Sequence, residues 1–517
     1  MLDFKCKVLK RDMNCADYKN ALNQYATSSV TNDDSVMNPA FIIYVEDDED
    51  IIKSIKYAKQ NDCAIAIRTG GHQYSGTSST SGKNLQLDLS KTYKTFDISK
   101  LQTDSLITCG ISLSLEEFSD KLVEHNIFVP HGECKSVYLG GHIQTGGYGV
   151  FCNPFGILGD HVESFEIITA DCIKKKITKN DNPDLFFAVL GGSPGNFGVM
   201  THVTLRVYKD TDFPESRGLM ALYPYRKKHL NNLLNLIEKW NKDTSIPKNI
   251  GFKITTRDAY INKFFVQPIK VILIIAINIP GIEGGDSRYD PKYFNDILNT
   301  SPSNLSIKGN NFDVCRIPLK HLPSSIKSLY INENTITPLS ILGAKSVFKF
   351  FGYREYDLPY IKRVYNCTIF DKIDFDKFAE MNTEIGRFFP FTKVDCVSIL
   401  ECGFINENSQ TVRNGTNGTG YNFRNFCPMI FDVFYYNKNT AIKYVNEIDK
   451  NMKTNKRLFW GSYIKEDESL TQDLFSKVHY DSMEKYNRLL QIKNETDPDK
   501  IFSPNEFCIG GMKNKLL

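Results

Sequence analysis

The feature that most constrains this 517-residue chain is a pair of adjacent glycines followed at once by a histidine, in the segment Arg68-Thr69-Gly70-Gly71-His72-Gln73-Tyr74-Ser75-Gly76. An apolar run at 64–67 precedes the segment and is typical of a buried strand. Two adjacent glycines let the backbone turn tightly and approach a ligand with no Cβ atom in the way. Their N–H groups can then face a diphosphate. The sequence therefore predicts that His72 stands at a ligand and not in the core.

Two further glycine-rich segments follow along the chain. The second begins at Cys134, continues through Gly140-Gly141-His142 and ends in Gly146-Gly147-Tyr148-Gly149. The third is Gly191-Gly192-Ser193-Pro194-Gly195-Asn196-Phe197-Gly198. The GxGxxG fingerprint of nicotinamide-binding folds is absent. One glycine pair alone is a weak signal, whereas three such segments in this order, with His72 and Cys134 both present, are a strong one.

Together the three segments resemble those of the berberine bridge enzyme-like FAD-linked oxidases, which belong to the vanillyl-alcohol-oxidase or PCMH-type FAD-binding fold. The resemblance implies FAD as the cofactor. It also implies covalent attachment, because His72 matches the family's histidine bonded to the flavin 8α-methyl carbon and Cys134 matches its cysteine bonded to the ring edge. The cofactor-binding residues that it implies, besides these two, are Arg68, Gly70, Gly71, Tyr74, Ser75, Gly140, Gly141, His142, Gly147, Tyr148, Asn196 and Gly198.

The resemblance implies an α+β fold with an FAD-binding domain and a substrate domain. A two-part PCMH-type FAD-binding domain is expected at 37–208, after a poorly defined lead-in at 1–36. A substrate domain is expected at 209–465, where strands interleave with amphipathic helices and predict an antiparallel sheet covered by helices. The closing segment 466–517 contains Asp497-Pro498-Asp499-Lys500-Ile501-Phe502, which resembles the family's final block and implies a return to the FAD domain.

Three tyrosines are the candidates for the catalytic base. Oxidation of a C–H bond by hydride transfer requires a base for the alcohol or phenol proton. In the family this base is a tyrosine or carboxylate of the substrate sheet or of the C-terminal segment. Tyr480 lies close to the family's tyrosine before the closing block, and Tyr435 and Tyr436 follow a strand at 429–434. Because side chains alternate along a strand, only one of the latter two can face the flavin.

The resemblance implies an FAD-linked oxidase that acts on an alcohol, a sugar or a secondary-metabolite C–H bond of a small molecule, with oxygen as acceptor and hydrogen peroxide as product. Lys485 and Phe423 depart from the family's pattern near the substrate. Leu139 stands at a position that gates oxygen in the family and commonly holds Val or Ile there, and leucine is bulkier in a different direction. Two alternatives therefore stay open: a dehydrogenase that uses another acceptor, and a catalytically inactive flavoprotein or carbohydrate-binding protein of the same fold.

Composition and charge bear on the other classes of function. A formal net charge of +3 gives no argument for nucleic-acid binding. The longest apolar run, 271–277, is too short to cross a bilayer. The first residues lack the apolar core of a secretory signal, so we expect a cytoplasmic protein. A metal site made of His72, Cys134 and His142 is a rival interpretation, but the spacing does not match zinc ligand pairs, and we expect no metal.

Overall fold

Two sheets build the N-terminal half of the protein in this computed structural model, which describes residues 4–13, 16–22, 37–73, 76–259, 269–301, 335–347, 359–367, 373–374, 377, 396–415, 417–422, 424, 427–453, 456–457 and 479–513. The first sheet has the order β1-β2-β4-β3, in which β2, β3 and β4 run parallel and β1 is antiparallel. Its strands are β1 Val8–Lys10, β2 Phe41–Tyr44, β3 Ile65–Arg68 and β4 Leu85–Asp88, accompanied by α1 Ala16–Leu22 and α2 Asp48–Gln60. Part of the lead-in thus supplies an edge strand of this sheet.

The second sheet is antiparallel and has the order β5-β6-β10-β8-β9. Its strands are β5 Phe96–Asp97, β6 Leu106–Gly110, β8 Val162–Ile168, β9 Lys174–Thr178 and β10 Val199–Arg206. A short ladder joins β7 Ile127–Phe128 to β11 Tyr208–Lys209. The helices of this part are α3 Leu101–Asp104, α4 Leu115–Glu124, α5 Leu139–Gln144, α6 Cys152–Phe155 and α7 Pro183–Val189. A capping box between Ser114 and Glu117 fixes where α4 begins.

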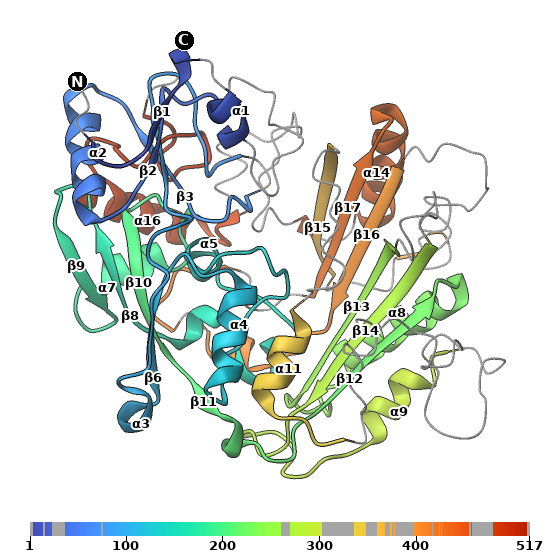
Figure 1. Ribbon diagram of the computed structural model, residues 1–517. Coiled ribbons are helices and arrows are strands. Elements are labelled where there is room, and N and C mark those ends of the chain that lie inside the picture. Colours follow the sequence, from blue (N-terminus) through green and yellow to red (C-terminus); the bar gives the residue numbers. More distant parts are fainter. Residues whose placement is uncertain are drawn as a thin grey trace.

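The C-terminal residues pack onto this N-terminal half, where Figure 1 draws α16 among the blue and green elements. Helix α16 spans Met483–Thr496. The ammonium group of its buried Lys493 donates to Asp497 Oδ2 at 2.6 Å and to the backbone carbonyl of Asn196. The side chain of Asn196 in turn donates to the Phe502 carbonyl and accepts from Ile509 N. The chain end and the third glycine-rich segment therefore share one buried polar network.

A seven-stranded antiparallel sheet forms the other half and stands beside the first (Figure 1). Its order is β12-β14-β13-β16-β17-β15-β18. The strands are β12 Arg217–Pro224, β13 Ile250–Ala259, β14 Ile269–Asn278, β15 Tyr360–Asn366, β16 Cys396–Gly403, β17 Pro428–Tyr435 and β18 Lys456–Arg457. The helices are α8 Lys227–Lys242, α9 Lys292–Leu298, α11 Leu339–Ser346, α13 Gln410–Arg413 and α14 Lys438–Met452. The predicted α+β architecture, with helices over an antiparallel sheet, is confirmed.

The two faces of this large sheet differ in chemistry. One face carries apolar side chains such as Ile254, Leu400 and Phe431, which form a core with Leu233 and Trp240 of α8. The opposite face is apolar at one end, where Ile275 of β14 packs with Phe128 and Phe151 of the N-terminal half. Towards β13, β16, β17 and β15 that same face becomes charged. No helix within the described ranges has the length and apolarity that a membrane crossing requires.

Candidate active site

One cavity of about 350 Å³ lies between the glycine-rich segments and the charged face of the large sheet. This volume falls within the range of small-molecule and cofactor pockets. The first glycine-rich segment contributes Gly70, Gly71 and His72, the second contributes Cys134, Gly140, Gly141, His142, Gly147 and Tyr148, and the third contributes Gly195 and Gly198. Three stretches far apart in the sequence are thus brought to a single site.

Strand β3 delivers His72 to this cavity. Arg68, the last residue of β3, lies outside the cavity lining and forms a buried ion pair with Asp88 of the neighbouring strand β4, with Nε 2.8 Å from Oδ2. This pair ties the end of β3 to the sheet just before the chain turns at Gly70 and Gly71. Arg68 therefore supports the turn from behind. Tyr74 and Ser75 lie outside the described residues.

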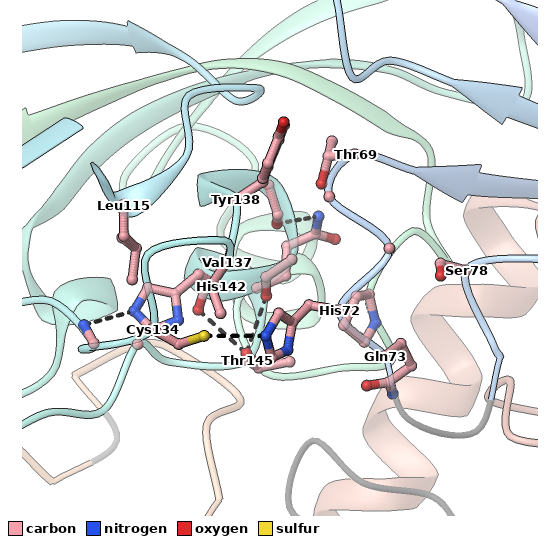
Figure 2. A pocket seen from close by; sticks show the side chains of 18 of the residues that line it. Thr69, His72, Gln73, Ser78, Leu115, Cys134, Val137, Tyr138, His142 and Thr145 are labelled. Atoms are coloured by element: carbon pink, nitrogen blue, oxygen red, sulfur yellow. Dashed lines mark hydrogen bonds between the residues drawn. The ribbon is translucent and has the colours of Figure 1, made fainter. Parts of the chain in front are cut away.

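His72 and Cys134 meet in the cavity although 62 positions separate them in the sequence. The distance between His72 Nε2 and Cys134 Sγ is 3.3 Å, and Figure 2 shows the two side chains pointing toward each other. Cys134 is partly exposed, whereas Cys63, Cys109 and Cys152 are buried. The two residues that the resemblance pairs are thus neighbours, and both present their nucleophilic atoms to one space.

The second segment enters α5 and supplies backbone to the cavity wall. His142 of α5 accepts a hydrogen bond at Nε2 from Gly132 N at 2.9 Å, and burial lowers its pKa to about 3. His142 is therefore a neutral acceptor at physiological pH. Gly147 adopts φ +78°, and a Cβ there would lie 2.6 Å from Leu158 Cβ. Burial raises the pKa of the cavity-lining Tyr148 well above its ordinary value, so its hydroxyl stays protonated.

The third segment is held to the second by a glutamine that no local sequence pattern singled out. Gln144 of α5 accepts from Gly195 N at 3.0 Å and donates to the Gly140 carbonyl at 2.9 Å. Gly195, Gly198 and Gln144 line the cavity, whereas Asn196 lies behind it in the network with Lys493. Gln144 therefore sets the distance between two stretches of the cofactor wall.

The large sheet closes the cavity with charged side chains. Lys253 of β13 donates to Glu133 Oε2 at 2.6 Å and lies 3.1 Å from Glu401 Oε2 of β16. Lys362 of β15 donates to Asp432 Oδ1 of β17 at 2.9 Å, and the two residues are direct Cα partners in the ladder. All five side chains line the cavity. Burial raises the pKa of Glu133, while the neighbouring Lys253 acts in the opposite direction.

The three tyrosines considered from sequence are absent from the lining of this cavity, as far as the described residues define it. Tyr435 points to the helix-covered side of β17 and packs with Val433 and Val445. Tyr436 follows the strand and is 54% exposed. Tyr480 is fully buried, with its ring 4.7 Å from that of His479. The structure therefore brings none of them to His72 and Cys134.

Sequence reasoning missed the four charged residues that the large sheet contributes and Glu133 of the N-terminal half. Lys253, Glu401 and Asp432 each stand alone between apolar or small residues in a strand, whereas Lys362 is followed by Arg363 and gives no such signal. A lone charge inside an otherwise apolar strand makes Lys253, Glu401 and Asp432 recognisable. Because burying an unpaired charge is costly, such a residue is expected to have a charged partner. The sequence does not show which charges pair, since that depends on the register of strands far apart in the chain.

The cavity fits a flavin in three respects. A Cβ added to Gly141 would meet nothing within 4 Å, so this backbone borders open space. Backbone from three glycine-rich turns surrounds that space, as a diphosphate and a planar ring require. Two nucleophilic side chains face it from one side. Among the described residues, no three His, Cys, Asp or Glu side chains are grouped as metal ligands.

Comparison with known protein families also indicates FAD as the ligand. Residues 39–173 match the FAD binding domain family. Among curated proteins, the chain is 30% identical over 182 residues to the FAD-linked oxidoreductase ZEB1 of Gibberella zeae, covering 33% of this chain and 31% of that protein. It is 32% identical over 184 residues to the FAD-linked oxidoreductase malF of Malbranchea aurantiaca, covering 33% and 31%. The matched segments thus span about a third of the length of these relatives.

Solved structures extend the likeness to the whole chain. A glucooligosaccharide oxidase from Acremonium strictum superimposes with a TM-score of 0.70 at 14% identity, over 98% of this chain and 96% of that one. The wild-type berberine bridge enzyme-like protein 1 of Physcomitrella patens gives 0.67 at 16% identity, over 98% and 97%. At such identities the likeness concerns the fold. The chain thus contains an FAD binding domain at 39–173 and shares its fold, over nearly its whole length, with solved FAD-linked oxidases and berberine bridge enzyme-like proteins.

Proposed function

We propose that the chain is an FAD-dependent oxidoreductase in which His72 and Cys134 both hold the flavin covalently and Asp432 accepts a proton from the substrate. One observation carries this proposal: a single cavity is lined both by the His72–Cys134 pair and by charged side chains of the large sheet. FAD, when bound there, supplies a two-electron acceptor for a hydride.

The two tethers are supported by the identity and the placement of the atoms involved. An imidazole nitrogen and a thiol sulfur that lie 3.3 Å apart can both reach one edge of a planar ring. The structural neighbour from Acremonium strictum is described as having a novel flavinylation. Tethering by two side chains fixes the ring in place without occupying the opposite side of the cavity, where the substrate then enters.

Asp432 is the base favoured by its surroundings. The carboxylates of Glu133 and Glu401 share Lys253, and this triad joins the two halves of the molecule. Asp432 and Lys362 instead belong to paired strands of one sheet, so their ion pair is not needed to join the halves. A carboxylate facing the cavity can take the hydroxyl proton as the carbon loses its hydride, which is the work of a general base.

The substrate we propose is a small molecule with an oxidisable alcohol, sugar or secondary-metabolite C–H bond. Two of the structural neighbours, a carbohydrate oxidase of Microdochium nivale and a chitooligosaccharide oxidase, are named for sugars. Lysine and carboxylate side chains opposite the tethers suit a substrate rich in hydroxyl groups. Oxygen is the proposed acceptor: it takes two electrons and two protons and leaves as hydrogen peroxide.

Two measurements test the proposal. The purified protein should remain yellow after acid precipitation, because covalent flavin stays with the pellet; flavin released entirely into the supernatant would refute the tethers. An anaerobic screen of oligosaccharides, phenols and alkaloids should then bleach the flavin with at least one substrate. Admission of air should restore the colour and form peroxide. Bleaching without reoxidation by air would favour a dehydrogenase, and no bleaching at all would favour an inactive binding protein.

A further inference from the structure

His72 and Cys134 lie close enough to share a proton before any cofactor is attached. The 3.3 Å between Nε2 and Sγ is within hydrogen-bonding distance for sulfur. A thiolate, and not a thiol, is the nucleophile in cysteine chemistry. An adjacent imidazole is a common means of activating a thiol. The pair therefore has the arrangement of a nucleophile with its base.

We propose that His72 accepts the thiol proton of Cys134 and thereby makes Cys134 the reactive nucleophile of the flavin-free chain. Its use in attachment rests on the proposed cysteine tether, but the reactivity of the thiol does not. His72 then has two roles in succession, first as the base for its neighbour and then as a tether. The consequence is an order of events: the sulfur bond forms fastest while the imidazole of His72 is still unattached.

The proton path needs one tautomer of the imidazole. With the ring proton on Nδ1, Nε2 accepts the proton of Sγ–H; after transfer, Nε2–H donates to the thiolate. When a C–S bond then replaces a C–H bond at the ring edge, the hydrogens lost from sulfur and from carbon leave as two protons. The two electrons released reduce dioxygen to hydrogen peroxide, so atoms and electrons balance.

The fold holds Cys134 in place through the residue before it. Glu133 is buried, and its Oε1 accepts from Val150 N at 3.0 Å while its Oε2 accepts from Lys253 at 2.6 Å. On the other side, Val137 N donates to the Cys134 carbonyl at 3.0 Å and closes a turn. The sulfur is therefore carried by a braced backbone. Because this backbone is held in place, the contact between Cys134 Sγ and His72 Nε2 is expected to persist.

Other cysteines supply internal controls. Cys172 is partly exposed like Cys134, but no histidine contact with it is seen in the described part of the chain, so it reports the reactivity that exposure alone confers. Cys63 and Cys152 are buried, and burial raises their pKa values to about 11 and about 12. These two thiols should react only if the chain unfolds.

The experiment measures the alkylation of each thiol in the full-length chain produced without flavin. Iodoacetamide is added between pH 6 and pH 9, and mass spectrometry of the peptides gives a rate for Cys134 and for Cys172. At pH 7 we expect Cys134 to react at least about tenfold faster than Cys172. His72→Ala should slow Cys134 at least about tenfold and leave Cys172 unchanged. Added imidazole should restore part of the Cys134 rate in that variant.

Equal Cys134 rates in the wild type and in His72→Ala would overturn the inference. Protection of Cys63 and Cys152 shows that a variant is folded, and His72→Asn serves as a second variant if the alanine chain fails this check. Peptide mapping of the FAD-loaded wild type separates this inference from the proposed function. If no flavin is found on Cys134, but Cys134 is still alkylated faster in the wild type than in His72→Ala, the cysteine tether is refuted. The proposed proton transfer from Cys134 to His72 then still holds.

Discussion

The two walls of the cavity are built in different ways. The wall from the N-terminal half combines glycine backbone with side chains that include His72, Cys134 and Tyr148, and much of its shape comes from turns that are local in the sequence. The wall from the large sheet is made of charged side chains on β13, β15, β16 and β17. The first wall suits one large cofactor, whereas the second places ionisable groups opposite it.

The N-terminal wall is therefore suited to binding a cofactor, and the sheet wall is suited to proton transfer. Backbone N–H groups in turns bind phosphate and flavin edges without titrating, so they serve the cofactor at any pH. Lysine and carboxylate side chains take up and release protons, and their ion pairs fix their positions. A substitution in the sheet wall should therefore alter the reaction rate or the stability and leave the cofactor attached.

The sharpest test of this division is Asp432→Asn, compared with Tyr480→Phe. Removal of a general base is expected to slow flavin reduction roughly a hundred- to ten-thousand-fold. Asparagine keeps the shape and still accepts from Lys362, so flavin content should not change. Tyr480→Phe should alter the reduction rate by less than about twofold, because Tyr480 lies outside the cavity lining. Single-turnover reduction under anaerobic conditions measures both rates; the reverse pattern would return the base to Tyr480.

A second test asks whether the Glu133–Lys253–Glu401 triad joins the two walls. Lys253→Met leaves two carboxylates without their shared ammonium group, at a cost of about 3–5 kcal/mol. We expect the thermal midpoint to fall by roughly 3–5 °C. The loss should be larger at pH 8 than at pH 5, because Glu133 can take up a proton at lower pH. Lys121→Met, which removes only an exposed pair with Glu124, should shift the midpoint by about 1 °C or less.

Calorimetry of Lys253→Met, with and without Glu133→Gln, measures this effect. The double variant should regain part of the lost stability, since it removes one of the two carboxylates. A midpoint for Lys253→Met equal to that of Lys121→Met would show that the triad does not hold the walls together.

A further expected effect is a loss of stability in acid that both halves share. Burial lowers the pKa of His131 in the N-terminal half and of His229 in the sheet half to about 4. An unfolded histidine titrates near 6.5, so the unfolded chain binds more protons between these values. Stability should therefore fall as the pH drops from about 6.5 to 4, by at most about 1.4 kcal/mol per pH unit for each histidine.

Scanning calorimetry at pH 7.5 and pH 5 checks the sign of this dependence. His229→Gln removes one titrating group from the sheet half and should flatten the dependence. An unfolding midpoint that stays constant or rises on acidification would show that these histidines are charged in the folded protein.

The main segments of the N-terminal cavity wall are recognisable from local sequence patterns. The Gly70-Gly71-His72 turn, the eight-residue offset between Cys134 and His142 and the third glycine-rich segment were all recognisable, because each depends on neighbours along the chain. The meeting of His72 with Cys134 followed from family resemblance, and the structure gives the distance between them. Arg68 and Asn196 were assigned to the cofactor but lie behind the cavity, where they brace β3 and the C-terminal segment.

The wall from the large sheet depends on packing between distant parts of the chain. Alternation along β17 predicts that Asp432 and Tyr435 point to opposite faces, but not which face meets the flavin side. That choice depends on the register of β17 with β15 and β16, and a slip of one residue would exchange the two faces. The pairing of Lys253 with Glu133 likewise joins residues 120 positions apart. Contacts of this kind arise from packing between the halves, which no local pattern in the sequence encodes.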